Sequence, residues 1–168
     1  MKVVAGGLWA GPVAVGLKSV LVVDNEAEHC LRIRQELRHL NLRNHVRCVT
    51  SAAEMISYLN GFAQFHDREE YPLPALLLVD LNLPLVDGFI VVEWIRSHER
   101  FCHIPIVVMG RPNQVGALEA AVKVGADAFM IKPFNRAQFE WIVMKMPVLL
   151  EFNWNDAFID QPLQNRPV

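Results

Sequence analysis

Short apolar runs alternate along the chain with longer segments in which apolar residues recur at helical spacing. The runs that predict strands are Ser19–Val23, Val46–Val49, Ala75–Val79, Ile104–Met109 and Ala128–Ile131. A run of about five apolar residues that ends in polar or turn residues is typical of a strand buried on both faces of a parallel sheet. The pattern therefore predicts five such strands, separated by helices.

Between and after these strands, apolar residues recur three or four positions apart, which predicts five amphipathic helices. The first helix carries its apolar residues at Cys30, Ile33, Leu37 and Leu40, and the others are expected after Ser51, at Phe89–Ser97, at Gln114–Val124 and after Asn135. Two of these helix starts have the spacing of a capping box, which pairs Ser51 with Glu54 and Asn135 with Gln138.

Five strand–helix units in succession predict an α/β fold with a parallel sheet and helices on both of its faces. At 168 residues the chain fits one domain, which we expect at 18–150. Residues 1–17 are expected to be a leader or flexible extension, because glycines and Pro12 interrupt the apolar stretch and leave it too short to span a bilayer. Residues 151–168 form the predicted tail.

Composition narrows the class of partner. The chain has 16 basic and 18 acidic residues, a net charge of −2, so it lacks the electrostatic footprint of a nucleic-acid-binding protein, and no basic cluster indicates a membrane surface. Its three cysteines, Cys30, Cys48 and Cys102, are odd in number and widely spaced. This spacing argues against a disulfide framework or a zinc site, favours a role as small apolar core residues, and is compatible with a reducing cytoplasm.

Asp80 is the first candidate for chemistry. The apolar run Ala75–Val79 leads directly to it, and a polar turn follows. In open α/β sheets the ligand crevice lies just outside the carboxyl ends of the strands. A carboxylate at this point is therefore a candidate site residue before any other residue is considered.

Three motifs at consistent intervals resemble the receiver domain of two-component response regulators. They are Val22-Val23-Asp24-Asn25-Glu26, Val79-Asp80-Leu81-Asn82-Leu83-Pro84 with Asp87-Gly88, and Gly125-Ala126-Asp127 with Ile131-Lys132-Pro133-Phe134. Each motif alone is a weak signal, but Lys132 follows Asp80 by 52 residues, as expected in that family. The resemblance spans about Lys18 to Leu150. It implies a flavodoxin-like, doubly wound, five-stranded parallel sheet in the order 2-1-3-4-5.

The resemblance implies a specific chemistry. Asp80 would be the phosphoacceptor, attacking the phosphoryl group of a sensor histidine kinase and holding it as an acyl phosphate. A Mg²⁺ ion would be held by oxygens of Asp24, Asn25, Asp80 and the backbone carbonyl of Asn82. Lys132 would neutralise the phosphoryl charge, and the proline after it would follow a cis bond. Such a protein is a signalling phosphoacceptor rather than an enzyme, and catalyses at most its own phosphorylation and dephosphorylation.

Two positions depart from the family pattern. Asn25 stands where the family usually has a second acidic residue, so Mg²⁺ should bind less tightly. Gly110 stands where the family has a Ser or Thr that bonds the phosphoryl group, and Arg111 replaces the small residue that follows. Arg111 could bind the phosphoryl group through its backbone N–H and guanidinium, or it could pair with Asp80 and block the pocket. Phe129, in place of the family's switch aromatic, lacks a hydroxyl group.

The long segment Phe62–Pro74 is expected to be a loop, which makes the interval from Asp24 to Asp80 about ten residues longer than in a minimal receiver. In this the chain is similar to small single-domain regulators that partner phytochrome-type kinases. The predicted tail is too short for a DNA-binding output domain. Its large apolar residues are expected to dock on a neighbouring surface, with a homodimer as one candidate: Phe152, Trp154, Phe158 and Ile159.

Two functions follow from these observations. The first is a cytoplasmic, single-domain response regulator that is phosphorylated on Asp80 and signals through protein–protein contacts, with its downstream partner left open. The alternative is a pseudo-receiver, an interaction module that works without phosphorylation, and Asn25, Gly110 and Arg111 favour it. A flavin-binding protein is disfavoured, because no Ser/Thr/Gly-rich phosphate loop follows the first strand and Asp24 would repel an anion there.

Overall fold

The structure is a computed structural model, and it describes residues 18–114 and 116–145 except for the side chain of Val143. The predicted leader at 1–17 and tail at 151–168, with its four large apolar residues, lie outside the described residues. The same holds for the last five residues of the predicted domain, 146–150.

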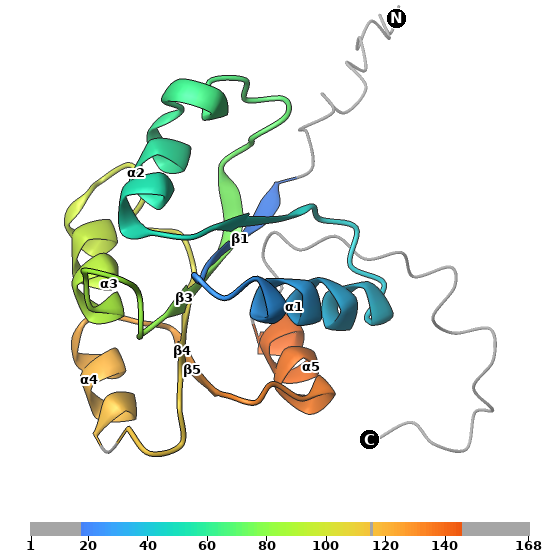
Figure 1. The fold of residues 1–168 in the computed structure, drawn as a ribbon, viewed down its shortest axis with the longest axis vertical. Helices are drawn as coiled ribbons and strands as arrows, with labels where there is room; N and C mark the ends of the chain where they lie inside the picture. Colours follow the sequence, from blue (N-terminus) through green and yellow to red (C-terminus); the bar gives the residue numbers. More distant parts are fainter. Residues whose placement is uncertain (1–17, 115, 146–168) are drawn as a thin grey trace, which may run out of the picture.

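Five parallel strands form one sheet in the order β2-β1-β3-β4-β5 (Figure 1). The strands are β1 (Ser19–Val23), β2 (Val46–Val49), β3 (Pro74–Asp80), β4 (Ile106–Gly110) and β5 (Ala128–Ile131). This order is the flavodoxin-like one and confirms the prediction. Because β3 pairs with both β1 and β4, its last residue, Asp80, ends the central strand of the sheet.

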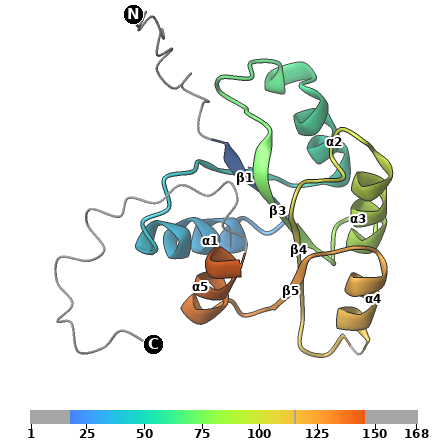
Figure 2. The same ribbon diagram turned by 180° about the vertical axis from the view of Figure 1, so that it is seen from behind.

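Helices cover both faces of the sheet. They are α1 (Ala27–His39), α2 (Ala52–Asn60), the short 3₁₀ helix η1 (Ala63–Phe65), α3 (Gly88–Ser97), α4 (Ala117–Lys123) and α5 (Arg136–Lys145). The two opposite views show α1 and α5 together on one face, with α2, α3 and α4 on the other (Figures 1 and 2). Within the described residues, no helix combines the length and the hydrophobicity that crossing a membrane would require.

Alternate residues of each central strand belong to two separate cores. Leu21 and Leu77 pack on the side of α2, α3 and α4, whereas Val20 and Leu76 pack on the side of α1 and α5. Every residue of β1, β3 and β4 is buried. The continuous apolar runs in the sequence therefore reflect a sheet that is covered on both faces.

Two element boundaries differ from the prediction. The fourth helix begins at Ala117 rather than Gln114, because Gly116 has a φ of 77°, a left-handed conformation that an α-helix cannot continue through. The fourth strand begins at Ile106 rather than Ile104, since Pro105 has no N–H and contributes only its carbonyl, to Leu77.

The segment predicted as a loop at Phe62–Pro74 is tied to the domain. Phe65 is buried, and its ring centroid lies 5.1 Å from that of Tyr58 and 5.2 Å from that of Tyr71. Arg68 donates hydrogen bonds of 2.8 Å to the carbonyls of Tyr58 and Leu59 in the last turn of α2, where carbonyls lack the usual helical partner four residues on. The additional residues of this segment thus cap the C-terminus of α2 and form an aromatic cluster.

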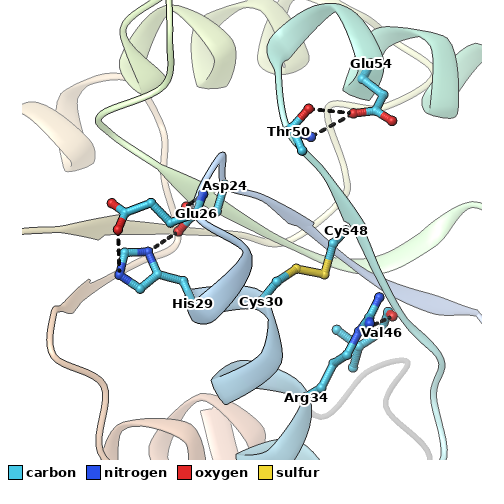
Figure 3. Close-up of a disulfide and its surroundings, with 9 residues drawn as sticks. All are labelled: Asp24, Glu26, His29, Cys30, Arg34, Val46, Cys48, Thr50 and Glu54. Carbon is cyan, nitrogen blue, oxygen red and sulfur yellow. Dashed lines mark hydrogen bonds and ion pairs between the residues drawn. A yellow bond between two sulfur atoms is a disulfide. The ribbon is translucent and has the colours of Figure 1, made fainter.

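The prediction of three unpaired cysteines is wrong for two of them. Cys30 on α1 and Cys48 on β2 form a disulfide (Figure 3). Their Cα atoms are 6.4 Å apart, within the range of about 4.4–6.8 Å that a disulfide spans. Only Cys102, which is exposed, is a free thiol among the described residues. The cysteines therefore no longer indicate that the protein is located in a reducing compartment.

Candidate functional site

Three strands deliver the candidate residues to one edge of the sheet. Asp24 directly follows β1, Asp80 ends β3, and Lys132 directly follows β5. The backbone N–H of Lys132 donates to the carbonyl of Gly110 at the end of β4, which fixes where the lysine side chain starts. The peptide bond between Lys132 and Pro133 is cis, as predicted.

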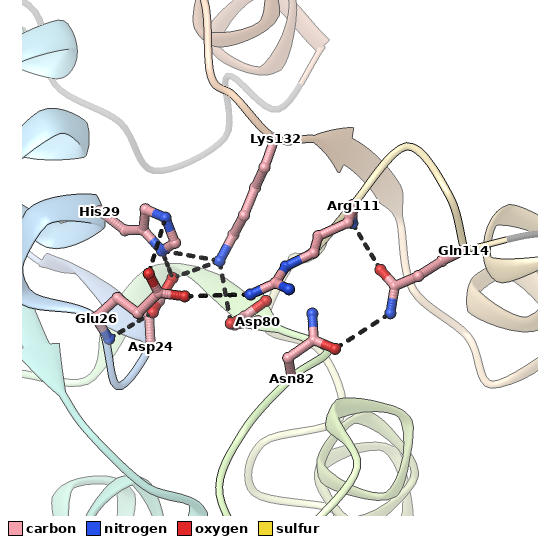
Figure 4. Close-up of polar contacts among 8 residues, drawn as sticks. All are labelled: Asp24, Glu26, His29, Asp80, Asn82, Arg111, Gln114 and Lys132. Carbon is pink, nitrogen blue, oxygen red and sulfur yellow. Dashed lines mark hydrogen bonds and ion pairs between the residues drawn. The ribbon is translucent and has the colours of Figure 1, made fainter.

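The three predicted residues meet in a buried ion cluster (Figure 4). Lys132 Nζ lies 2.9 Å from Asp24 Oδ2 and 3.0 Å from Asp80 Oδ2. The side chains of both carboxylates are fully buried, and that of the lysine is 7% exposed. One ammonium group thus compensates two carboxylates that the sheet has removed from water.

Asp80 keeps unused bonding capacity. Its contact with Lys132 has the distance of an ion pair but not the angles of a hydrogen bond, and neither carboxylate oxygen accepts a hydrogen bond from the described residues. Buried polar atoms are normally hydrogen-bonded, so such a carboxylate is suited to bind something else. A Mg²⁺ ion fits here, because it takes oxygen ligands of this kind and both Asp24 and Asp80 can supply them.

Close backbone packing holds the end of β3 in place. Gly88 begins α3, and its N–H donates to the carbonyl of Leu81 at 3.1 Å. A Cβ atom on Gly88 would overlap the carbonyl oxygen of Asp80 and lie 2.8 Å from the Cα of Leu81. The glycine of the Asp87-Gly88 motif is therefore needed for this close approach.

Asn25 and Asn82, the other two predicted metal ligands, are both exposed. The side chain of Asn82 accepts a hydrogen bond of 3.4 Å from Gln114 Nε2, which leaves its backbone carbonyl as the predicted ligand. Asn25 lies in the bend directly after Asp24. Its predicted role as a ligand stays a prediction.

The room next to Gly110 is taken by Phe129 and Gln114. A Cβ atom on Gly110 would lie 2.5 Å from Phe129 Cζ and 2.8 Å from Gln114 Oε1. Phe129 packs against the core on the side of α2, α3 and α4. The ring of Phe129 therefore occupies space that a Ser or Thr side chain at position 110 would need.

Gly110→Ser should lower the free energy of unfolding by about 1–3 kcal/mol, because the added side chain overpacks this contact. Phe129→Leu shortens the opposing side chain, so the double variant should recover part of the loss, with a coupling of at least about 0.5 kcal/mol. Urea unfolding of the wild type, both single variants and the double variant measures this coupling. Strictly additive effects would show that Phe129 does not occupy the site of the missing side chain.

Arg111 does not pair with Asp80. Its ion pair is with Glu26, at 3.7 Å between Nη2 and Oε1, and both side chains are about half exposed. Figure 4 shows the arginine extending past the Asp80 carboxylate toward Glu26. A surface pair at this distance contributes little to stability and is easily exchanged. Arg111 therefore passes beside the Asp80 carboxylate without forming an ion pair with it.

Sequence reasoning assigned no role to three residues of the site. Gln114 accepts the backbone N–H of Arg111 at 2.6 Å, which is the donor predicted for a phosphoryl group. His29 Nδ1 lies 2.9 Å from Asp24 Oδ2, and Glu26 Oε2 lies 3.6 Å from the other ring nitrogen of His29. The only signal for His29 is its position in the first turn of α1, five residues after Asp24. Gln114 carries none, because its side chain reaches the site from a loop.

Comparison with known proteins agrees with this geometry. Residues 20–143, most of the chain, match the family model of the response regulator receiver domain. The chain is 26% identical over 138 residues to the probable methanogenesis regulatory protein FilR2 of Methanothrix harundinacea, a match that covers 81% of this chain and 84% of FilR2. It is 30% identical over 118 residues to the transcriptional regulatory protein GltR of Pseudomonas aeruginosa, covering 70% of this chain but only 44% of GltR.

Solved structures with the same fold include two bacteriophytochrome response regulators. RtBRR has a TM-score of 0.69 and 29% identity, with 79% of each chain covered. AtBRR has a TM-score of 0.68 and 27% identity, covering 79% of this chain and 94% of that one. The family model matches most of the chain, and Asp24, Asp80 and Lys132 meet in one buried cluster. The chain therefore belongs to the response regulator receiver domain family.

Proposed function

We propose that Asp80 accepts a phosphoryl group from a sensor histidine kinase and that the phosphorylated domain signals through protein–protein contacts. The proposal rests on the surroundings of the Asp80 side chain. It is a fully buried carboxylate at the end of the central strand, it accepts no hydrogen bond from the described residues, and it lies 3.0 Å from a lysine ammonium. A nucleophile must be held in position with its lone pairs uncommitted; the end of β3 positions Asp80, and its oxygens accept no hydrogen bond from the described residues, which supports this role.

In the proposed reaction, a carboxylate oxygen of Asp80 attacks the phosphorus of a phosphohistidine. A P–O bond forms, the P–N bond breaks, and the leaving imidazole nitrogen keeps the electron pair and takes up a proton. Lys132 is already directed at Asp80 and moves its charge to the phosphoryl oxygens as they arrive. A bound Mg²⁺ ion, held by Asp24, Asp80 and the carbonyl of Asn82, would supply further neutralisation of the phosphoryl charge.

The response to phosphorylation can begin at Gln114. Its side chain holds the N–H of Arg111, and the carbonyl of Gln114 accepts the N–H of Ala117 at the start of α4. A phosphoryl oxygen that takes the Arg111 N–H would release Gln114 and shift the position of α4. Phosphorylation would thus change a population of states through a local exchange of hydrogen bonds.

The two bacteriophytochrome response regulators among the structural neighbours support a phytochrome-type kinase as the phosphoryl donor. A cytoplasmic location is part of the same proposal, because the kinase draws its phosphoryl group from cytoplasmic ATP. Catalysis by the chain itself would be limited to its own phosphorylation and dephosphorylation.

Incubation with acetyl phosphate and Mg²⁺ should add one phosphoryl group, seen as a mass increase in intact-protein mass spectrometry. Asp80→Asn should abolish the adduct, because an amide oxygen cannot form the acyl phosphate. Asp87→Asn is the matched control: Asp87 is exposed and caps α3, and asparagine caps equally well.

An adduct that persists in Asp80→Asn would refute the assignment of the acceptor. If the wild type itself forms no adduct with acetyl phosphate and gives no complex with beryllofluoride, phosphorylation is not its mode of action. Binding to partners unaffected by Asp80→Asn would then be expected, as for the phosphate-independent module suggested by Asn25, Gly110 and Arg111.

A further inference from the structure

The disulfide between Cys30 and Cys48 joins a helix to an edge strand of the sheet. Cys30 lies in the first turn of α1, and Cys48 lies in β2, which is at one edge of the sheet beside β1. Among the described residues, one other polar bond joins α1 to β2: Arg34 Nε donates to the carbonyl of Val46 at 3.2 Å (Figure 3). The position of α1 against β2 therefore depends on the disulfide in addition to apolar packing.

Both cysteines are sequence neighbours of residues that contact Asp24. Next to Cys30, His29 Nδ1 lies 2.9 Å from Asp24 Oδ2. Next to Cys48, the carbonyl of Val49 accepts the backbone N–H of Asp24 at 3.0 Å. The disulfide thus links the two segments that hold Asp24, one from α1 and one from β2. A change in the separation of the cysteines would shift the groups on both sides of this carboxylate.

Asp24 and His29 are in turn connected to the acceptor through Lys132. Its Nζ lies 2.9 Å from Asp24 Oδ2, 2.9 Å from His29 Nδ1 and 3.0 Å from Asp80 Oδ2. Movement of either neighbour therefore changes where the ammonium lies relative to Asp80. Such changes matter for a reaction, because a misplacement of about 1 Å can cost about a hundredfold in rate.

A cavity of about 240 Å³ lies beside the disulfide. Both cysteines line it, together with Asp24 and the exposed residues Leu31 and Arg34. Cys48 is partly exposed, whereas Cys30 is buried. The guanidinium of Arg34 favours the thiolate form of a thiol that enters the cavity. Of the two sulfur atoms, that of Cys48 is therefore the one that an external thiolate reaches more easily.

The compartment of the proposed reaction bears on this disulfide. Asp80 would be phosphorylated by a kinase that uses cytoplasmic ATP, and cytoplasmic thioredoxin and glutathione keep thiols reduced. Disulfides in cytoplasmic proteins are usually transient and either catalytic or redox-sensing. A disulfide and a phosphoacceptor occur together in such a compartment when the disulfide opens and closes with the redox state.

We infer that Cys30 and Cys48 form a redox site whose partner is a protein dithiol of the thioredoxin type, and that reduction of this site slows phosphorylation of Asp80. The inference rests on the proposed function, because the rate that it concerns is that of phosphorylation. The oxidised protein holds Asp24 and His29 from both α1 and β2, and the reduced protein holds them less firmly.

Reduction proceeds by thiol–disulfide exchange. A thiolate of the partner attacks Cys48 Sγ, the disulfide bond breaks, and Cys30 leaves as a thiolate that takes up a proton. The second thiol of the partner then attacks the mixed disulfide as a thiolate and releases Cys48, which also takes up a proton. The partner is oxidised to a disulfide, and the receiver gains two electrons and two protons. Exchange with an oxidised dithiol reverses the reaction.

Counting thiols in the Cys102→Ser protein tests the exchange. This substitution removes the exposed free thiol and leaves Cys30 and Cys48 as the cysteines of the chain. The folded protein is oxidised with oxidised glutathione, incubated with reduced thioredoxin, quenched with acid and labelled with a maleimide in urea. Intact-protein mass spectrometry should show two labels after thioredoxin, and none without it or with thioredoxin that lacks its active-site cysteines. Two labels before reduction, or none after it, would overturn the inference.

The initial rate of adduct formation with acetyl phosphate and Mg²⁺ tests the coupling to Asp80. The reduced protein should react at least about threefold more slowly than the oxidised protein, which is well within the cost of a small misplacement. Cys48→Ser in the Cys102→Ser protein cannot form the disulfide, so it should react at the rate of the reduced protein and not respond to thioredoxin. Cys48→Ala replaces it if circular dichroism shows that the serine variant is unfolded. A difference below threefold between the oxidised and reduced proteins would overturn the coupling.

The NMR signals of the His29 imidazole give a readout that does not use phosphorylation. Assigned with His29→Gln, they should shift between the oxidised and reduced proteins, whereas those of His103, exposed between α3 and β4, should not. If neither form is phosphorylated, the proposed function and the control of its rate both fail, and a shift of His29 alone still supports a redox site coupled to Asp24. Equal rates of phosphorylation on Asp80 with unshifted His29 signals would keep the proposed function and overturn this inference.

Discussion

Lys132→Met should lower the free energy of unfolding at neutral pH by about 3–5 kcal/mol, the usual cost of leaving a buried charge without its partner. The effect is expected to be large because one ammonium serves two fully buried carboxylates, Asp24 and Asp80. Methionine has a similar length and flexibility, so packing is kept while the charge is lost. Urea unfolding followed by circular dichroism, in buffer with EDTA, measures the difference.

Divalent cations should reverse part of this loss. A bound ion replaces the missing charge between the carboxylates, so the stability of Lys132→Met should rise more with added Mg²⁺ than that of the wild type. Lys123→Met is the matched control, because Lys123 is exposed on α4 and its loss should change stability by about 0.5 kcal/mol or less. Equal stability of Lys132→Met and Lys123→Met in EDTA would mean that the buried ion cluster does not contribute to folding.

Gly88→Ala should cost about 1–3 kcal/mol or more and should also slow phosphorylation. The added methyl group meets the backbone of Asp80 and Leu81 rather than the flexible end of a side chain. It can be accommodated only if the end of β3 shifts, and that shift moves the acceptor relative to Lys132. Unfolding by urea and the initial rate of adduct formation with acetyl phosphate give the two readouts.

Gly116→Ala separates this effect from the general cost of replacing a glycine. No atom lies within 4 Å of a Cβ at Gly116, but its φ of 77° makes alanine strained there. That variant should lose about 1–2 kcal/mol while phosphorylation proceeds at the rate of the wild type. If Gly88→Ala also left the phosphorylation rate unchanged, the close contact between α3 and the acceptor strand would have no role in positioning Asp80.

The parallel sheet and the central part of the site could be predicted because they depend on short-range patterns, whereas the order of the strands followed from the resemblance of three motifs to the receiver family. Strands buried on both faces are apolar throughout, so β1 and β3 appear in the sequence within a residue of their observed limits. Residues that follow parallel strands must meet at one edge of the sheet. Asp24, Asp80 and Lys132 could therefore be placed together before any coordinates were considered.

The disulfide and the surroundings of the acceptor could not be predicted in this way. Cys30 and Cys48 are 18 residues apart, and only the packing of α1 beside β2 brings their sulfur atoms together. Gly110 was read as a missing hydroxyl group, whereas its surroundings show that Phe129 and Gln114 fill the corresponding space. On sequence grounds Arg111 could bind the phosphoryl group or pair with Asp80, whereas in the structure its side chain pairs with Glu26.

The sequence by itself thus determined a parallel α/β sheet through its apolar runs, and the receiver fold with its acidic pair and lysine through three motifs that resemble the family. Both signals are local features of the chain, which the sheet translates directly into position. Only the tertiary structure decided which side chains from helices and loops reach that pair. His29 and Gln114 enter the site through the direction of a helix and the course of a loop, and these depend on packing between segments distant in the chain.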